Sequence, residues 1–204
     1  MSRAPLPAFY DDLEAAFAEL WRLLADGAAH GRNGFHLPAL ATLGAAGTPR
    51  LRTLVLRAAD RDAGTLRFHC DRRSDKAAEI LAHPACALAA YDETAKVQIR
   101  IEGDAALHTD DAVADAAWAG SRAMSRICYG AEPGPGTALR AGGAYTLPDE
   151  AMAAALGRPH FAAVMVRAEC LDFLYLDRRG NRRATWRRSG TGGPEGWRGA
   201  WVVP

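Results

Sequence analysis

Residues 65–76 of the chain read Thr-Leu-Arg-Phe-His-Cys-Asp-Arg-Arg-Ser-Asp-Lys. The first half is typical of a strand, and the second half of a tight basic turn that leads into a helix with Ser74 as its N-cap. Free backbone N–H groups at a helix start attract anions, and the side chains of Arg72, Arg73, Ser74 and Lys76 could add charge-assisted hydrogen bonds to a phosphate. Taken alone, however, the stretch is more typical of a capped surface helix with solvated charges.

The preceding segment, residues 50–57, reads Arg-Leu-Arg-Thr-Leu-Val-Leu-Arg. In a strand, Arg50 and Arg52 face one way and Arg57 faces the other way. Arginines within such an apolar run need an anionic or hydrogen-bonding partner if they are buried. They could equally lie at strand ends and reach water, so this segment alone leaves the choice open.

The following segment, residues 96–103, reads Lys-Val-Gln-Ile-Arg-Ile-Glu-Gly and alternates between apolar and polar residues. Gln98 lies on the polar side, where its amide offers both a donor and an acceptor to an aromatic heterocycle. Taken alone, these polar residues are more simply interpreted as the solvent-exposed face of a sheet.

The periodicity of the whole chain predicts a mainly β protein with peripheral helices, arranged as a barrel. No internal repeat and no long linker divides it, so we expect a single domain over residues 1–204. Helices are predicted at 8–25 (ending near Gly27), 74–83, 110–125 and 148–157, with a loop at 130–143. Strands are predicted at 35–43, 50–58, 65–70, 85–91, 96–107, 161–168, 171–177, 182–188 and 197–203.

Composition excludes several classes of protein. The chain has 204 residues, 49% of them hydrophobic, which can bury a core without disulfides or metals. Its four cysteines are widely spaced, and the net charge of +1 argues against general nucleic-acid or membrane affinity. No apolar run approaches a membrane span and the start lacks a signal-peptide core, so we expect a cytoplasmic protein. No HExxH, HxH or GxSxG motif occurs, so no metal site is predicted and catalytic residues stay unassigned.

Taken together and in order, these segments resemble the pyridoxamine 5′-phosphate oxidase family, the FMN-binding split β-barrels. That family has an R-x-V-L-L-K-like strand, an F-Y-T strand end, S-R-K at a helix start, and R-Q-V followed by a glycine. The matching stretches here are Arg52–Arg57, Phe68–Cys70, Ser74–Lys76 and Val97–Ile99 with Gly103. The resemblance implies a six-stranded antiparallel split β-barrel that binds FMN and forms a homodimer with flavin at the subunit interface.

The resemblance also implies which residues bind the flavin. Arg52 and Lys76, with Ser74, would bind the phosphate of FMN. The other implied contacts to the flavin are Thr53, Leu54, Val55, His69, Cys70 and Gln98. Asp75 stands where the family has an arginine, and we expect Arg73 to supply the missing cation. Arg57 replaces a lysine that helps to hold substrate in the family.

Towards the C-terminus the resemblance is looser. The family contributes a Gln-Ser pair ahead of an S-R-I-like sequence to the neighbouring subunit's flavin, and here only Ser125 and Arg126 match it. The family's R-x-H-x-R strand corresponds to residues 181–188, Asn-Arg-Arg-Ala-Thr-Trp-Arg-Arg, where the histidine is absent. Trp186 and Arg187 are the residues expected to contact the flavin there.

The sequence therefore favours an FMN-dependent oxidoreductase whose small-molecule substrate is unassigned. One alternative is a genuine pyridoxamine or pyridoxine 5′-phosphate oxidase, against which the missing histidine argues. Another is a non-enzymatic anion- or ligand-binding barrel that uses its arginines.

Overall fold

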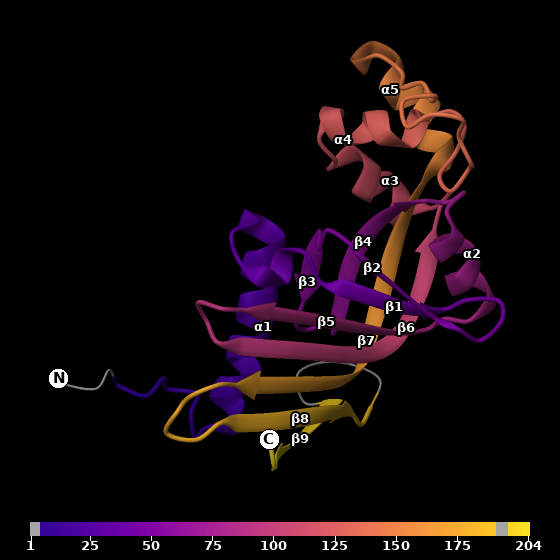
Figure 1. Ribbon diagram of the computed structural model, residues 1–204. Helices are drawn as coiled ribbons and strands as arrows, with labels where there is room; N and C mark the ends of the chain where they lie inside the picture. The colour runs from indigo at the N-terminus through magenta and orange to yellow at the C-terminus, as the bar shows by residue number, and fades with distance from the viewer. Residues whose placement is uncertain (1–4, 191–195) are drawn as a thin grey trace.

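A single antiparallel sheet forms the body of the computed structural model, which describes residues 5–190 and 196–204 (Figure 1). Its strands are β1 (Ala39–Leu43), β2 (Pro49–Thr53), β3 (Ala58–Asp60), β4 (Thr65–Asp71), β5 (Ala85–Asp92), β6 (Val97–His108), β7 (Phe161–Tyr175), β8 (Arg182–Arg188) and β9 (Trp197–Val202). They follow the order β2-β1-β5-β6-β7-β4-β3, and β8 joins β7 to β9. The sheet is not closed, as in a split barrel, so the predicted fold class is confirmed; the described residues contribute nine strands rather than six.

Helices cover one side and one end of this sheet. They are α1 (Leu13–His30), α2 (Asp75–Ala82), α3 (Ala112–Ala119), α4 (Ala123–Ile127) and α5 (Glu150–Gly157), with short 3-10 turns η1 (Gly34–His36), η2 (Cys128–Gly130) and η3 (Arg158–His160). Figure 1 shows α3, α4 and α5 gathered at the far end of β6 and β7, away from α1. We call residues 112–160 the helical tip.

The core lies between α1 and the inward face of the sheet. Alternate residues of the strands point into it, among them Phe68, Ile99 and Phe173, all fully buried. From α1, Leu20 and Trp21 complete the same cluster. Burial of one alternating face leaves the other face of the strands free for a site or a partner.

The first helix has the predicted length of 18 residues but lies five residues later in the chain. It begins at Leu13 because Asp12 is the N-cap and accepts a hydrogen bond from the backbone N–H of Ala15 at 3.0 Å. Gly27 does not end it: a Cβ there would lie 2.9 Å from the carbonyl carbon of Phe35, so glycine permits a close approach within the helix. The helix ends at Gly31, whose φ of 64° is left-handed.

The predicted strand 50–58 is two strands in the structure. The backbone N–H groups of Leu54 and Leu56 donate to the carbonyl oxygens of Pro38 and His36, and Leu56 is fully buried. These contacts draw the chain out of the ladder between β2 and β3. The region before β1 differs too, since the predicted strand 35–43 begins as η1 and becomes extended only at Ala39.

Two further predictions are wrong in their boundaries. The predicted strands 161–168 and 171–177 form one strand, β7, because a bulge at Glu102/Gly103 of the neighbouring β6 absorbs the irregularity. Gly103 is required there, since a Cβ would lie 2.0 Å from the carbonyl oxygen of Arg167. The predicted helix 110–125 is broken between α3 and α4.

Candidate functional site

The turn from β4 into α2 is built as a strand, a tight turn and a helix start, as predicted. Ser74 is the N-cap residue, but its hydroxyl donates to the carbonyl oxygen of Asp71 at 2.6 Å and makes no cap bond to α2. Lys76 Nζ donates to Ser74 Oγ at 3.1 Å, which brings the ammonium group back to the helix start. No side chain caps the first N–H groups of α2, an arrangement that suits an anion.

Arg52 points from β2 towards α2 and meets a carboxylate that the sequence did not reveal. Its Nη2 donates to Glu79 Oε2 at 2.6 Å, and its Nη1 donates to the Thr42 hydroxyl and to the Arg50 carbonyl oxygen. The Thr42 hydroxyl in turn donates to Glu79 Oε2 at 2.5 Å. Since a guanidinium carries five N–H groups, these three bonds leave two of them for a ligand.

Glu79 is an ionised carboxylate in this network. Its side chain is 9% exposed, and that of Arg52 is 20% exposed. Burial alone would raise the pKa of Glu79, but hydrogen bonds from Thr42 and Arg52 and the charges of Arg52 and Arg50 outweigh it and hold the pKa below its ordinary value. The negative charge therefore stays beside the predicted phosphate ligand at neutral pH.

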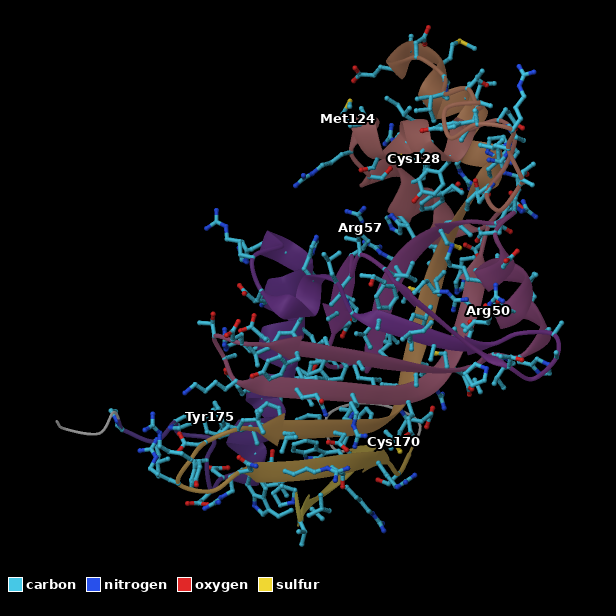
Figure 2. The ribbon with its side chains drawn as sticks, in the orientation of Figure 1. Arg50, Arg57, Met124, Cys128, Cys170 and Tyr175 are labelled. Carbon is cyan, nitrogen blue, oxygen red and sulfur yellow. The ribbon has the colours of Figure 1, made fainter. Side chains whose placement is uncertain are left out.

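The cation that offsets Asp75 is Arg50 rather than the predicted Arg73. Arg50 Nη2 lies 3.5 Å from Asp75 Oδ2, and its Nε lies 3.6 Å from Glu79 Oε1 (Figure 2). Arg73 is occupied elsewhere: it pairs with Asp71 at 2.8 Å and with Glu132 at 2.7 Å, and it donates to carbonyl oxygens of the helical tip. The shared strand face of Arg50 and Arg52 was the signal in the sequence that favoured Arg50.

A second group of cations lies between the barrel and the helical tip, where Figure 2 places Arg57. His69 projects from β4 on the face opposite Phe68, and its ring packs edge-on against Phe161 at 4.8 Å. Its Nε2 is buried without a hydrogen-bond partner, as is Nε of Arg67. Burial first, then the charges of Arg57 and Arg67, lower the pKa of His69 to about 4.

No acidic side chain pairs with Arg57 or Arg67 in the described part of the chain, so Arg57, Arg67 and His69 form a basic site with unused hydrogen-bonding groups. A buried polar atom without a partner costs about 1–3 kcal/mol. A ligand that offers hydrogen-bonding groups would remove this cost. Tyr129 of the helical tip also packs on Phe161, at 5.1 Å, so aromatic rings lie beside this basic site.

The other residues predicted to contact the flavin differ in their exposure. Thr53 is exposed and Leu54 and Val55 are half-buried, so they can line a ligand. Cys70 instead faces the core, 4% exposed, and burial raises the pKa of its thiol to about 11. Cys70 can therefore offer its backbone, but not its sulfur atom, to a ligand. Gln98 is half-buried on the outward face of β6, opposite Tyr91 and Leu174.

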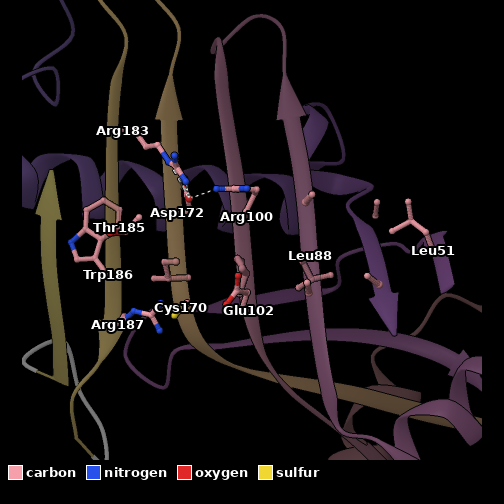
Figure 3. A pocket seen from close by; sticks show the side chains of 16 residues that line it. Leu51, Leu88, Arg100, Glu102, Cys170, Asp172, Arg183, Thr185, Trp186 and Arg187 are labelled. Carbon is pink, nitrogen blue, oxygen red and sulfur yellow. Dashed lines mark hydrogen bonds and ion pairs between the residues drawn. The ribbon is translucent and has the colours of Figure 1, made fainter. Parts of the chain in front are cut away.

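The outward face of the sheet carries a shallow hollow of about 400 Å³ that runs from β2 to β8. Arg100 of β6 and Arg183 of β8 both pair with Asp172 of β7, and Thr185 and Arg187 lie beside them (Figure 3). The apolar part of this face includes Leu51, which is 72% exposed. Arg187 is exposed and makes no ion pair within the described ranges.

The tryptophan predicted to contact flavin does not share this exposure. Trp186 is 3% exposed and its ring packs against Phe17 at 5.4 Å, because Ala184 and Trp186 take the inward positions of β8. Arg183 and Thr185 are the outward residues that the prediction missed. The alternation of β8 contained this signal, since residues two apart share a face.

The two predicted residues of the helical tip differ in their bonding. Arg126 donates to the carbonyl oxygens of Trp118 and Ala119 and to Ser121 Oγ, and it lies over the Trp118 ring at 5.1 Å. These contacts close the turn between α3 and α4. Ser125 is half-buried, and its hydroxyl makes no hydrogen bond within the described residues.

Comparison with known proteins agrees with this fold. Residues 18–109 match the family model "Pyridoxamine 5'-phosphate oxidase, FMN-binding domain". The crystal structure of a pyridoxamine 5′-phosphate oxidase-related, FMN-binding protein from Nostoc punctiforme PCC 73102 is 26% identical, with a TM-score of 0.67, and the match covers 98% of this chain and 100% of that chain. A search of curated proteins found no match.

More distant solved structures share the fold. PhzG from Burkholderia lata 383, solved with tetrahydrophenazine-1-carboxylic acid, is 20% identical over 100% of both chains, with a TM-score of 0.72. A protein of Clostridium acetobutylicum related to general stress protein 26 is 12% identical, covers 83% of this chain and 94% of that chain, and has a TM-score of 0.55.

The fold is that of a split barrel. More narrowly, residues 18–109 match the model of the FMN-binding domain of pyridoxamine 5′-phosphate oxidase, which confirms the resemblance found in the sequence. None of the described helices is long and apolar enough to cross a membrane.

Proposed function

We propose that the protein binds FMN and is an oxidoreductase that acts on a small molecule other than pyridoxamine 5′-phosphate. When bound, the flavin supplies the two-electron chemistry, and the protein supplies binding, orientation and electrostatics. The observation that carries the proposal is the pair of unsatisfied basic sites, one at the start of α2 and one between the barrel and the helical tip.

The start of α2 suits the phosphate of FMN. Arg52 keeps two unused N–H groups, Lys76 holds its ammonium group at the helix start, and the first N–H groups of α2 are uncapped. The ring would then extend along residues 53–57 towards His69. This order along the chain supports the assignment, because Arg52 at one end and His69 at the other keep hydrogen-bonding groups that a flavin can use.

The basic site around His69 suits the ring and the substrate. His69 is neutral at physiological pH because its pKa is about 4. Its uncharged ring can therefore donate or accept a hydrogen bond at Nε2, depending on the tautomer. Arg57 has no acidic partner among the described residues and can orient an electron-rich group. Phe161 packs against the rings of His69 and Tyr129, at 4.8 and 5.1 Å, which gives the site an apolar side.

The absence of a histidine on β8 supports a substrate different from pyridoxamine 5′-phosphate. The register of β8 turns Ala184 into the core and Thr185 outward, so Thr185 takes the position of the family's histidine. A threonine hydroxyl cannot titrate near neutral pH as an imidazole does. One of the side chains with which the family binds its substrate, the histidine, is therefore replaced in this chain.

We propose further that the protein is a cytoplasmic homodimer with flavin at the subunit interface. The outward face around the hollow supports this, because Leu51 is 72% exposed there and Tyr91 is 47% exposed. A second copy on this face would cover both and would bring Arg187 towards the partner's flavin. Light scattering of the purified protein should give twice the chain mass, 21.8 kDa; a monomer would contradict this part of the proposal.

The visible spectrum of the purified protein tests the cofactor. Bands near ~370 and ~450 nm, a property of oxidised flavin itself, would support the proposal. A colourless protein that FMN fails to reconstitute would favour the non-enzymatic anion-binding barrel instead. Incubation of the loaded protein with pyridoxamine 5′-phosphate should yield neither aldehyde nor peroxide; formation of both would identify a genuine pyridoxamine 5′-phosphate oxidase.

A further inference from the structure

We propose that Glu79 sets the affinity of the α2 site for a phosphate in two opposing ways: it holds Arg52 in place, and its charge repels the anion that Arg52 binds. Glu79 is thus a positioning residue for the flavin phosphate. The inference rests on the proposed FMN site, and it adds a residue that neither the sequence motifs nor the comparisons with known proteins single out.

The positioning role follows from the hydrogen bonds. Glu79 Oε2 accepts from both Arg52 and Thr42, and Thr42 also accepts from Arg52, so the three side chains form a closed triangle. The triangle joins α2 to β1 and β2. It leaves the Arg52 guanidinium a single orientation, with its two unused N–H groups free for a ligand.

The opposing role follows from the charges. Around the start of α2, the cations are Arg50, Arg52 and Lys76, and the carboxylates are Asp75 and Glu79. The nearest charges therefore leave one net positive charge to meet a phosphate. Asp75 is exposed and screened by water, whereas Glu79 is 9% exposed and acts through a medium of lower dielectric constant. Its charge is the one that matters more to a bound anion.

Two substitutions separate these roles. Glu79→Gln retains an oxygen that can accept from Arg52 and Thr42 but removes the negative charge. Glu79→Leu removes both the charge and the acceptor, so Arg52 loses its fixed orientation. Glu19→Gln is the matched control, because Glu19 pairs with Arg22 on the exposed surface of α1.

The experiment is a fluorescence titration of flavin-free protein with FMN and, separately, with riboflavin, which lacks the phosphate. We expect Glu79→Gln to bind FMN roughly tenfold more tightly than the unaltered protein, the effect of removing one opposing charge near a protein surface. Riboflavin affinity should not change. A purely structural effect would instead change both affinities.

Glu79→Leu should bind FMN more weakly than Glu79→Gln, and Glu19→Gln should match the unaltered protein. If the unaltered protein binds FMN but Glu79→Gln binds it no more tightly, this inference is overturned while the proposed function stands. If the unaltered protein binds no FMN, both fall. The outcome is decided by Glu79→Gln, so it holds even if Glu79→Leu fails to fold.

Discussion

Replacing Arg52 by methionine should destabilise the protein even when no flavin is present. Methionine preserves most of the apolar stem of Arg52 but removes the guanidinium, so Glu79 loses its 2.6 Å partner. At 9% exposure, the carboxylate cannot recover this bond from water. If Arg52 served only as a ligand for phosphate, no such loss would be expected.

The size of the effect can be worked from the contacts. A hydrogen bond to a charged group contributes about 1.5–3 kcal/mol, and leaving one partner of a buried ion pair uncompensated costs about 3–5 kcal/mol. Glu79 retains its bond from Thr42, and Arg50 lies 3.6 Å away, which offsets part of the penalty. We therefore expect Arg52→Met to lower the free energy of unfolding by about 2–4 kcal/mol.

Urea denaturation of flavin-free protein, followed by tryptophan fluorescence, measures this quantity. The double variant Arg52→Met/Glu79→Gln should recover much of the loss, because it no longer carries an unpaired buried charge. A single variant that loses less than about 1 kcal/mol would refute the reasoning, since it would place the pair in the range of exposed ion pairs. A double variant no more stable than the single one would refute it as well.

Three other outcomes are expected. Lys76→Ala should weaken FMN binding by about 1.5–3 kcal/mol with little loss of stability, since Lys76 makes only one side-chain bond among the described residues. An unchanged affinity in a fluorescence titration would show that Lys76 does not bind the phosphate. Gly103→Ala should lower the free energy of unfolding by about 1–3 kcal/mol, because its Cβ would lie 2.0 Å from the Arg167 carbonyl oxygen. Gly142 lies in open space, so Gly142→Ala should lower the free energy of unfolding far less in the same urea titration. In the unfolded chain, the imidazole of His69 takes up a proton as pH falls below its ordinary pKa of 6.5, whereas in the folded protein it does so only near pH 4. Protonation therefore favours the unfolded chain, and the free energy of unfolding should fall by up to about 3 kcal/mol as pH drops from 6.5 to 4. His69→Gln should remove that part of the loss in urea titrations at the two pH values, and an unchanged pH dependence would show that His69 is not buried as described.

Much of the fold was predictable from local pattern. The alternation of residues 96–103 placed Gln98 opposite the core side, and the turn before α2 was assigned from Ser74. Both signals are local, because side-chain period and capping preference act within a few residues. Boundaries failed where a glycine allows close packing instead of ending a helix, as at Gly27, which lies within α1 against the Phe35 backbone.

The bonding of the candidate site could not be predicted from the sequence. The sequence placed Arg52 and Lys76 near one helix start, and in the structure Arg52 bonds to Glu79 of α2 and Lys76 to Ser74, its N-cap. It could not indicate that Glu79, twenty-seven residues from Arg52, would occupy part of its guanidinium. Nor could it show that Arg73 turns towards Glu132 of the helical tip, fifty-nine residues away, and leaves Asp75 to Arg50.

By itself, then, the sequence determined the class of fold, the order of the segments that resemble the family's motifs and the basic helix start, since periodicity and motif spacing are properties of the chain. Only the tertiary structure decided which charges meet. Trp186 points into the core and Thr185 outward because β8 pairs with β7 in one register. Glu79 reaches Arg52 because α2 packs across β1 and β2. Ion pairing depends on distances of a few ångströms between segments remote in sequence, and packing alone sets those distances.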